Sequence, residues 1–124
     1  MAQSGNGSPP TISTHVLDTA SGKPAVGIHV TLSKLGDDGP IRMTQALTDA
    51  DGRVRDLLER PLTAGVYRLE FRVAPPGATA ADVATPDERF FERIAVDVRV
   101  DDVTRSHHVP LLLGPYSVTS YRGS

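Results

Sequence analysis

The sequence contains no cysteine and no tryptophan, and its only aromatic residues are three tyrosines and three phenylalanines. Without cysteine the chain has no disulfide framework, no thiol nucleophile and no thiolate metal site. Apolar runs long enough to cross a bilayer are also missing. Stability therefore has to come from an aliphatic core, and any catalysis has to use histidine, carboxylate, hydroxyl or basic side chains.

The sequence also lacks an excess of charge of either sign. Thirteen Lys and Arg residues stand against 15 Asp and Glu residues, for a net charge of −2, and no long single-sign run occurs. The chain thus lacks the basic footprint of a nucleic-acid-binding protein and the polybasic patch of a membrane-surface protein. Residues 1–10 are small and polar, without the basic start and apolar stretch of a signal peptide. We expect a cytoplasmic protein that binds neither nucleic acid nor membrane.

A chain of 124 residues corresponds to one domain. At this size, folding buries about two thirds of the surface of the unfolded chain, which suffices for a core without covalent cross-links. We expect residues 1–10 to be disordered and residues 11–124 to form the domain.

Short segments rich in β-branched residues recur about every ten residues, with turn residues between them. Seven or eight such strands predict an all-β protein, an antiparallel sandwich or barrel. One short helix is expected at residues 78–83, and residues 57–62 are ambiguous. The expected strands cover residues 11–18, 26–35, 41–48, 53–55, 65–74, 90–100 and 109–113, followed by a return strand after the turn at 114–115.

Strand parity singles out the segment 109–113, because it is apolar on both faces. His108 shares one face with Leu112, whereas His107 shares the other with Val109 and Leu111. A two-layer sandwich covers only one face of each sheet, so a second apolar face requires another cover, for which a second subunit is the best candidate. The first strand behaves similarly, with His15 beside Leu17. The pattern predicts an oligomer interface over these two strands, with histidines inside it.

Other candidate sites are weaker. The two adjacent histidines point to opposite faces and cannot act on one ligand together, so one is expected to be structural. His29 lies among hydroxyl side chains and is expected to be solvated. No histidine spacing typical of a zinc site occurs. The segment 49–52, Asp-Ala-Asp-Gly, resembles a calcium loop only superficially, because the required acid is missing six residues after the glycine; it is expected to be a β-turn.

The chain resembles the transthyretin-like 5-hydroxyisourate hydrolases from about residue 11 to its last residue. In this family the C-terminal ending is specific, because the hormone-carrying transthyretins share the fold but not this terminus. The segments that carry the resemblance are Ser-Thr-His-Val-Leu-Asp at 13–18, Gly-Lys-Pro-Ala at 22–25, Thr-Asp-Ala-Asp-Gly-Arg at 48–53, His-Val-Pro-Leu-Leu-Leu at 108–113, Pro-Tyr-Ser at 115–117 and Tyr-Arg-Gly-Ser at 121–124.

The resemblance implies a transthyretin-like sandwich of two four-stranded sheets with one short helix. It implies a homotetramer, a dimer of dimers, with active sites at the dimer–dimer interface. The implied reaction is the cofactor-free and metal-free hydrolysis of 5-hydroxyisourate, the product of urate oxidase, to 2-oxo-4-hydroxy-4-carboxy-5-ureidoimidazoline. This ring opening is the second step from urate to allantoin in purine catabolism.

The same resemblance implies that His15, Arg53 and His108 are catalytic. Histidines with a pKa near neutrality suit the activation of water, and an arginine suits the binding of an oxygen-rich substrate and its oxyanion. Substrate binding is implied for His15, Arg53, Tyr121, Arg122 and Ser124. Where the family has His-Tyr-His this chain has Ser-His-His at 106–108, so His107 is expected to be structural. Which histidine is the general base stays open.

Two alternatives remain beside the hydrolase. One is a transthyretin-type carrier that binds a small ligand in its central channel, and the other is a structural or adhesive β-sandwich whose histidines are incidental. The combination of His15, Arg53 and His108 with the C-terminal ending favours the hydrolase, because a carrier needs an apolar channel and not two histidines and an arginine at its mouth.

Overall fold

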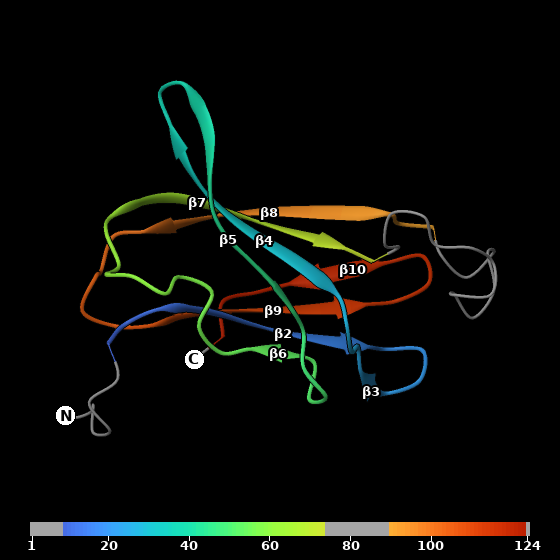
Figure 1. Cartoon of the computed structure of the whole chain (residues 1–124). Helices are drawn as coiled ribbons and strands as arrows, with labels where there is room; N and C mark the ends of the chain where they lie inside the picture. The colour runs from blue at the N-terminus through green and yellow to red at the C-terminus, as the bar shows by residue number, and fades with distance from the viewer. Residues whose placement is uncertain (1–8, 74–89, 124) are drawn as a thin grey trace.

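The computed structural model describes residues 9–73 and 90–123. Two β-sheets lie face to face in this part of the chain, as Figure 1 shows. The helix expected at 78–83 and most of the segment 1–10 lie outside the described residues. Within the described ranges, no helix of the length and apolar character needed to cross a bilayer occurs.

The first sheet has five strands and contains both ends of the domain. Its order is β10-β9-β2-β3, and β6 also pairs with β2. The pairing of β2 with β9 is parallel, whereas the other pairs of this sheet are antiparallel. The strands are β2 (Ile12–Asp18), β3 (Lys23–Pro24), β6 (Arg53–Val54), β9 (His107–Leu113) and β10 (Val118–Ser120).

The second sheet has four antiparallel strands in the order β5-β4-β7-β8. A register shift between Leu32 and Ser33 interrupts the pairing of β4 with β5. Beyond it the β4–β5 hairpin projects from the sandwich (Figure 1). The strands are β4 (His29–Gly36), β5 (Gly39–Leu47), β7 (Gly65–Arg72) and β8 (Arg93–Val100).

The core lies between the sheets and follows the predicted alternation. On β7 the buried side chains are Tyr67, Leu69 and Phe71, and each neighbour between them is half-buried on the outer face. Fully burying one such side chain contributes about 1.5–3 kcal/mol. The facing sheet contributes its own buried residues, which include Ile12, Val16, Val109, Leu111 and Leu113. The structure confirms an all-β sandwich of two sheets, with five and four strands in place of four and four. The expected antiparallel arrangement holds for every pair except β2 with β9.

Three segments differ from the sequence-based expectation. The strand expected from residue 26 begins at His29, because Gly27 has a φ of 75°, which an extended strand does not accommodate. Residues 23–24, which lie between the strands expected at 11–18 and 26–35, form β3 and pair with the end of β2. The ambiguous segment 57–62 is not a strand, yet it buries Leu57, Leu58 and Leu62 in the core.

Candidate active site

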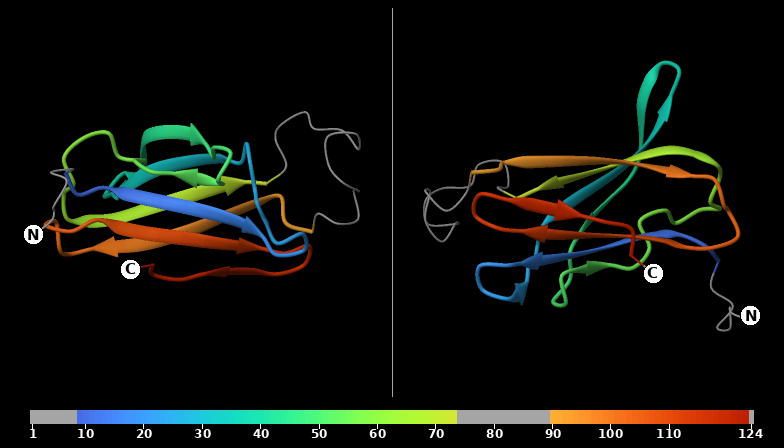
Figure 2. Two further views of the ribbon diagram at one scale, coloured as in Figure 1. Left: turned by 90° about the horizontal axis from the view of Figure 1, so that it is seen from below. Right: turned by 180° about the vertical axis from the view of Figure 1, so that it is seen from behind.

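The three predicted catalytic side chains lie on one face of the five-stranded sheet. His15 on β2 is directly opposite Arg53 on β6, and Ser13, two residues before His15, is opposite His108 on β9. The intervening Thr14 is buried toward the core, so these four side chains share the outer face. The view from below in Figure 2 shows β6, β2, β9 and β10 side by side on this face.

A tight turn places Arg53. The N–H of Gly52 donates to the Asp49 carbonyl oxygen at 2.9 Å, and the Asp49 carboxylate accepts the N–H of Arg53 at 3.0 Å. This N–H donor lowers the pKa of Asp49. Gly52 has a φ of 75°, and a Cβ there would lie 2.5 Å from the carbonyl oxygen of Val16. The segment 49–52 is thus the predicted β-turn, and it joins the start of β6 to the middle of β2.

His108 is the most constrained member of the group. Its Nδ1 lies 2.8 Å from the Ser13 hydroxyl oxygen. Partial burial lowers the pKa of His108, and the nearby Arg53 guanidinium and His15 add to this effect. A lowered pKa keeps the imidazole neutral at pH 7, which is the form that accepts a proton from water.

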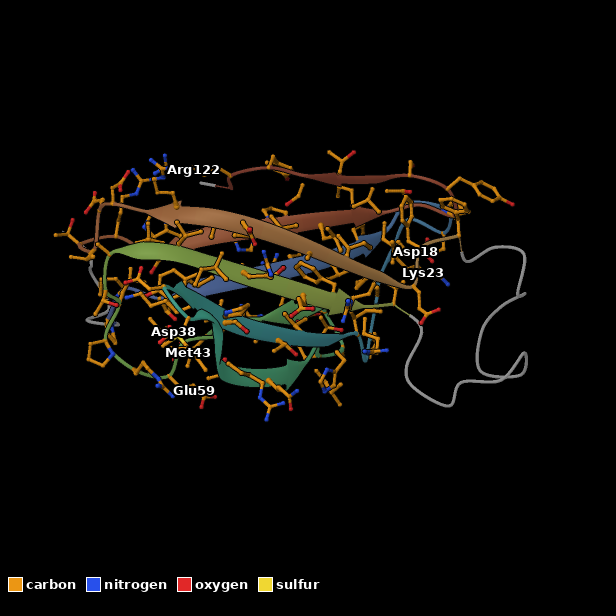
Figure 3. The ribbon with its side chains drawn as sticks, turned by 90° about the horizontal axis from the view of Figure 1, so that it is seen from above. Asp18, Lys23, Asp38, Met43, Glu59 and Arg122 are labelled. Carbon is orange, nitrogen blue, oxygen red and sulfur yellow. The ribbon has the colours of Figure 1, made fainter. Side chains whose placement is uncertain are left out.

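The C-terminal tail folds back over β9. After β10, the N–H of Gly123 donates to the carbonyl oxygen of His108 at 2.8 Å. A Cβ at Gly123 would lie 2.6 Å from Cδ2 of the His108 ring, so the glycine allows the backbone to contact the imidazole. Tyr121 is 54% exposed and Arg122 is exposed. Figure 3 shows Arg122 at the opposite end of the sandwich from Asp18 and Lys23.

Two hollows meet at His108. One, of about 360 Å³, is lined by Ser13, Arg53, Arg55, Ser106 and His108, with parts of Thr14 and Val54. The other, of about 410 Å³, lies on the tail side, and its lining includes His107, His108, Tyr121 and Arg122. The second hollow also includes side chains of β8 and the following loop. His108 is therefore the residue that borders both the basic hollow and the hollow under the C-terminal tail.

His107 lies in a different environment from His108. It is opposite the buried Ile12 in the β2–β9 register, so it lies on the inner-facing side. Its Nε2–H donates to the carbonyl oxygen of Asp102 at 2.9 Å. The hydroxyl of Ser106 accepts the N–H of Thr11 at 3.1 Å. Both contacts tie the start of β9 to neighbouring backbone, as expected for residues with a structural role.

The structure brings His15, Arg53 and His108 together on one face and places Tyr121 and Arg122 along a hollow that His108 borders. Ser124 lies outside the described residues.

His29, expected to be solvated, is half-buried on the other sheet, opposite Arg72. Sequence reasoning missed Ser13 and Gly123 as neighbours of the imidazole. The alternation of β2 places Ser13 on the same face as His15, which is a signal in the sequence for Ser13. That Ser13 contacts His108 follows only from the register between β2 and β9. No group of three His, Cys, Asp or Glu side chains that could hold a metal ion occurs within the described ranges.

Residues 12–123 match the family described as "Transthyretin: HIUase/Transthyretin family". The chain belongs to this family. The family member of Deinococcus radiodurans named 5-hydroxyisourate hydrolase is 41% identical over 117 residues, which cover 93% of this chain and 97% of that protein. The family resemblance inferred from the sequence is therefore confirmed over nearly the whole domain.

Solved structures of the HIUase/Transthyretin family agree with this assignment. The Klebsiella pneumoniae 5-hydroxyisourate hydrolase superposes with a TM-score of 0.75 at 33% identity, covering 93% of this chain and 99% of that one. Transthyretin from Sparus aurata superposes with a TM-score of 0.76 at 27% identity, covering 90% of this chain and 95% of that one. The fold is thus common to proteins named 5-hydroxyisourate hydrolase and transthyretin, and the sequence identity to the two hydrolases named here is higher than to the transthyretin.

Proposed function

We propose that this protein is an enzyme, a 5-hydroxyisourate hydrolase that opens the cyclic amide of its substrate to give 2-oxo-4-hydroxy-4-carboxy-5-ureidoimidazoline. The observation that carries the proposal is the position of His15, Arg53 and His108 on one sheet face. The 5-hydroxyisourate hydrolases named above support it, because the chain covers nearly their full length.

In the proposed mechanism, His108 is the general base. Its neutral imidazole takes one proton from a water molecule, and the resulting hydroxide adds to a carbonyl carbon of the substrate ring. The C–N bond of the tetrahedral adduct then breaks, the released nitrogen takes up the proton held by His108, and the carboxylic acid that is formed loses its remaining proton to solvent. His15, which faces the same site, is the second group for proton transfer. Water is the only co-reactant that this balance needs, so the proposed reaction uses no cofactor and no metal.

Arg53 is assigned the substrate oxygens. No ion pair of Arg53 with a carboxylate occurs among the described residues, so its guanidinium is available to a ligand. A guanidinium can hold a planar, oxygen-rich ring by paired hydrogen bonds and stabilise the oxyanion of the tetrahedral adduct. Removing one such donor from an active site costs about 10²–10³ in kcat.

Substrate-binding roles are proposed for the C-terminal residues Tyr121, Arg122 and Ser124. Support comes from the fold of the tail: Tyr121 and Arg122 line the hollow that His108 borders, and Gly123 is bonded to the His108 backbone. The tail would close the pocket on the side opposite Arg53. A C-terminal extension should therefore impair activity more than an N-terminal extension of the same length.

A homotetramer, a dimer of dimers, is proposed as the active form. The outer face of the five-stranded sheet carries the half-buried Leu17 and Leu112 beside the site. In the view from below in Figure 2, no other described strand lies over this face. A second subunit over this face would bury these side chains and exclude water from the site. A cytoplasmic location also stays a prediction, which fractionation of cells can test.

The test uses urate oxidase to generate 5-hydroxyisourate, whose decay is followed by absorbance. The purified protein should accelerate the decay in proportion to its concentration. The carrier alternative has the support of the shared fold with Sparus aurata transthyretin. An unchanged decay rate, together with saturable binding of an aromatic ligand, would replace the hydrolase by the carrier.

A further inference from the structure

The hydroxyl of Ser13 forms a hydrogen bond with the imidazole of His108. It lies 2.8 Å from Nδ1 of His108, in a partly buried contact between β2 and β9. Ser13 and His108 are opposite each other in the register of these strands, so the contact is built into the sheet. Among the described residues this is the only hydrogen bond of the Ser13 side chain.

We propose that Ser13 is a positioning residue that holds His108 in the tautomer with the proton on Nδ1, which leaves Nε2 free to accept a proton from water. The part of this inference that concerns catalysis rests on the proposed hydrolase function. The part that concerns the tautomer is a property of the free protein and can be measured without substrate.

The chemistry of imidazole shows which form the contact favours during proton uptake. In the neutral ring, one nitrogen carries the proton and the other has the lone pair, and a hydroxyl can partner either nitrogen. In the imidazolium both nitrogens donate, so only the tautomer with the proton on Nδ1 keeps this hydrogen bond unchanged when the ring takes up a proton. With Nδ1–H donating to the Ser13 oxygen, Nε2 has the lone pair. After Nε2 takes a proton, the Nδ1–H donation remains in place and becomes charge-assisted. The same contact therefore serves His108 before and after proton uptake.

The other edge of the ring favours the same orientation. Gly123 lies against Cδ2 of His108, the ring atom that exchanges places with Nδ1 when the ring flips. A flipped ring would turn Nδ1 toward the tail backbone and away from the Ser13 hydroxyl. Ser13 and Gly123 thus bracket the imidazole from two edges, and Nε2 is the nitrogen left for a ligand.

The charges around His108 do not select a tautomer by themselves. They come from several elements, and most are cationic, so they act mainly on the total charge of the ring. Because the Ser13 hydroxyl accepts from the imidazolium, its removal should lower the pKa of His108 further. The titratable and charged residues that line the two hollows at His108 are Arg53 and Arg55 in one, and His107, Arg99, Asp101, Asp102, Tyr121 and Arg122 in the other, and His15 is close enough to act on the pKa of His108.

The competing explanation is that the Ser13 hydroxyl merely ties β2 to β9. The chain offers a matched control for it, because Thr14 is the next residue and its hydroxyl donates to the Val109 carbonyl oxygen at 2.6 Å. This second contact joins the same two strands on the opposite, buried face. Thr14→Val removes an inter-strand hydroxyl bond without touching the imidazole.

The first measurement is a long-range ¹H–¹⁵N NMR spectrum of the histidine rings in the free protein, with the His108 signals assigned from a His108→Asn variant. We expect Nδ1 of His108 to be protonated in the wild type and in Thr14→Val. Ser13→Ala should give a mixture of tautomers, and Ser13→Thr, which keeps the hydroxyl, should restore the wild-type pattern. A wild-type ring protonated on Nε2, or an unchanged spectrum in Ser13→Ala, would overturn the proposal.

The second measurement is kinetic. Ser13→Ala should lower kcat about tenfold, less than the full 10²–10⁴ of general base catalysis, because the base is misplaced and not removed. KM should stay within about twofold, because positioning acts on the base and not on ground-state binding. The acid limb of the pH profile should move to lower pH, because loss of the hydroxyl acceptor lowers the pKa of His108. Equal losses of kcat in Ser13→Ala and Thr14→Val would show a structural role. Absence of any hydrolysis by the wild type would refute the hydrolase function and leave the NMR result to decide on the tautomer.

Discussion

The outer faces of the two sheets carry similar residue types but satisfy them differently. On the four-stranded sheet, two pairs of opposite charges bridge neighbouring strands. Arg68 on β7 binds Asp97 on β8 at 2.7 Å, and Arg93 on β8 lies 3.5 Å from Glu70 on β7. The hydrogen bonds from Arg68 hold the pKa of Asp97 below its ordinary value. These paired charges can face water without a further partner, although each exposed ion pair contributes at most about 1 kcal/mol to stability.

On the five-stranded sheet, the outer face has histidines and an arginine beside aliphatic side chains. Leu112 is half-buried and Pro110 is buried, and within the described chain neither His15, Arg53 nor His108 forms an ion pair with a carboxylate. The comparison teaches that a basic side chain on a β-sheet indicates a binding site only under two conditions. No carboxylate of the sheet pairs with it, and apolar side chains beside it would be buried by a second subunit.

The largest effect should come from the histidines. His108→Asn and His15→Asn should each lower kcat by about 10²–10⁴, the contribution typical of positioned acid–base groups. His29→Asn, on the outer face of the other sheet, should change kcat less than twofold. Decay of 5-hydroxyisourate measures all three. Equal losses in all three variants would erase the distinction between the faces.

The arginines give the next comparison. Arg53→Ala should lower kcat/KM by about 10²–10³, because it removes the proposed oxyanion donor. Arg72→Ala removes a half-buried arginine from the outer face of the other sheet and should leave kcat/KM nearly unchanged. The assay is the same. A small loss in Arg53→Ala would exclude the arginine from the reaction.

A charge introduced on each face tests the proposed cover. Leu112→Lys should dissociate the tetramer into smaller species, because an unpaired buried charge costs several kcal/mol. Thr31→Lys places the same charge opposite Glu70 on the other sheet and should leave assembly intact. Light scattering after size-exclusion chromatography reports the mass. An intact Leu112→Lys tetramer would place the interface elsewhere.

The tail contact predicts a smaller effect. In Gly123→Ala the added Cβ would lie 2.6 Å from Cδ2 of His108, so either the ring or the tail must move, and kcat/KM should fall about tenfold. Gly36→Ala is the control, because a Cβ there finds its nearest atoms at 3.8 Å. Equal kinetics of the two variants would show that the tail does not position the imidazole.

The smallest effect is the pH dependence. Burial, Arg53 and His15 lower the pKa of His108 below 6.5, so its neutral form persists at pH values where an exposed histidine is already half protonated. Protonation at lower pH then removes the base. At pH 6.5 we expect kcat/KM to exceed half of its value at pH 8. A steeper loss, centred above pH 6.5, would indicate a solvated base and weaken the contrast between the faces.

Much of the fold could be predicted from residue alternation. The side chains of β7 and β8 alternate as expected, and parity correctly placed His15 with Leu17, and His108 with Leu112, on an outer face. These predictions succeeded because side-chain direction in a strand is a local property with a period of two.

The register between distant strands could not be predicted. Alternation does not show that β2 and β9 run parallel, so the contact of Ser13 with His108 was invisible in the sequence. The same limit applies to Gly123, whose role depends on the tail crossing one ring. Gly27 ended a predicted strand early because a single positive φ overrides the alternation that surrounds it.

The parallel pairing of β2 with β9 has a consequence for the order of folding. The contacts between these strands join residues 95 apart in the chain, as in the pair of Ser13 and His108. Contacts of such large sequence separation form slowly, because the loop between them must close first. During synthesis β2, with His15, leaves the ribosome early, whereas β9, which carries His108, follows only when nearly the whole domain has been made. A chain interrupted before β9 therefore exposes one edge of β2 and has no active site, so a partial product is inactive and open to strand pairing with other chains.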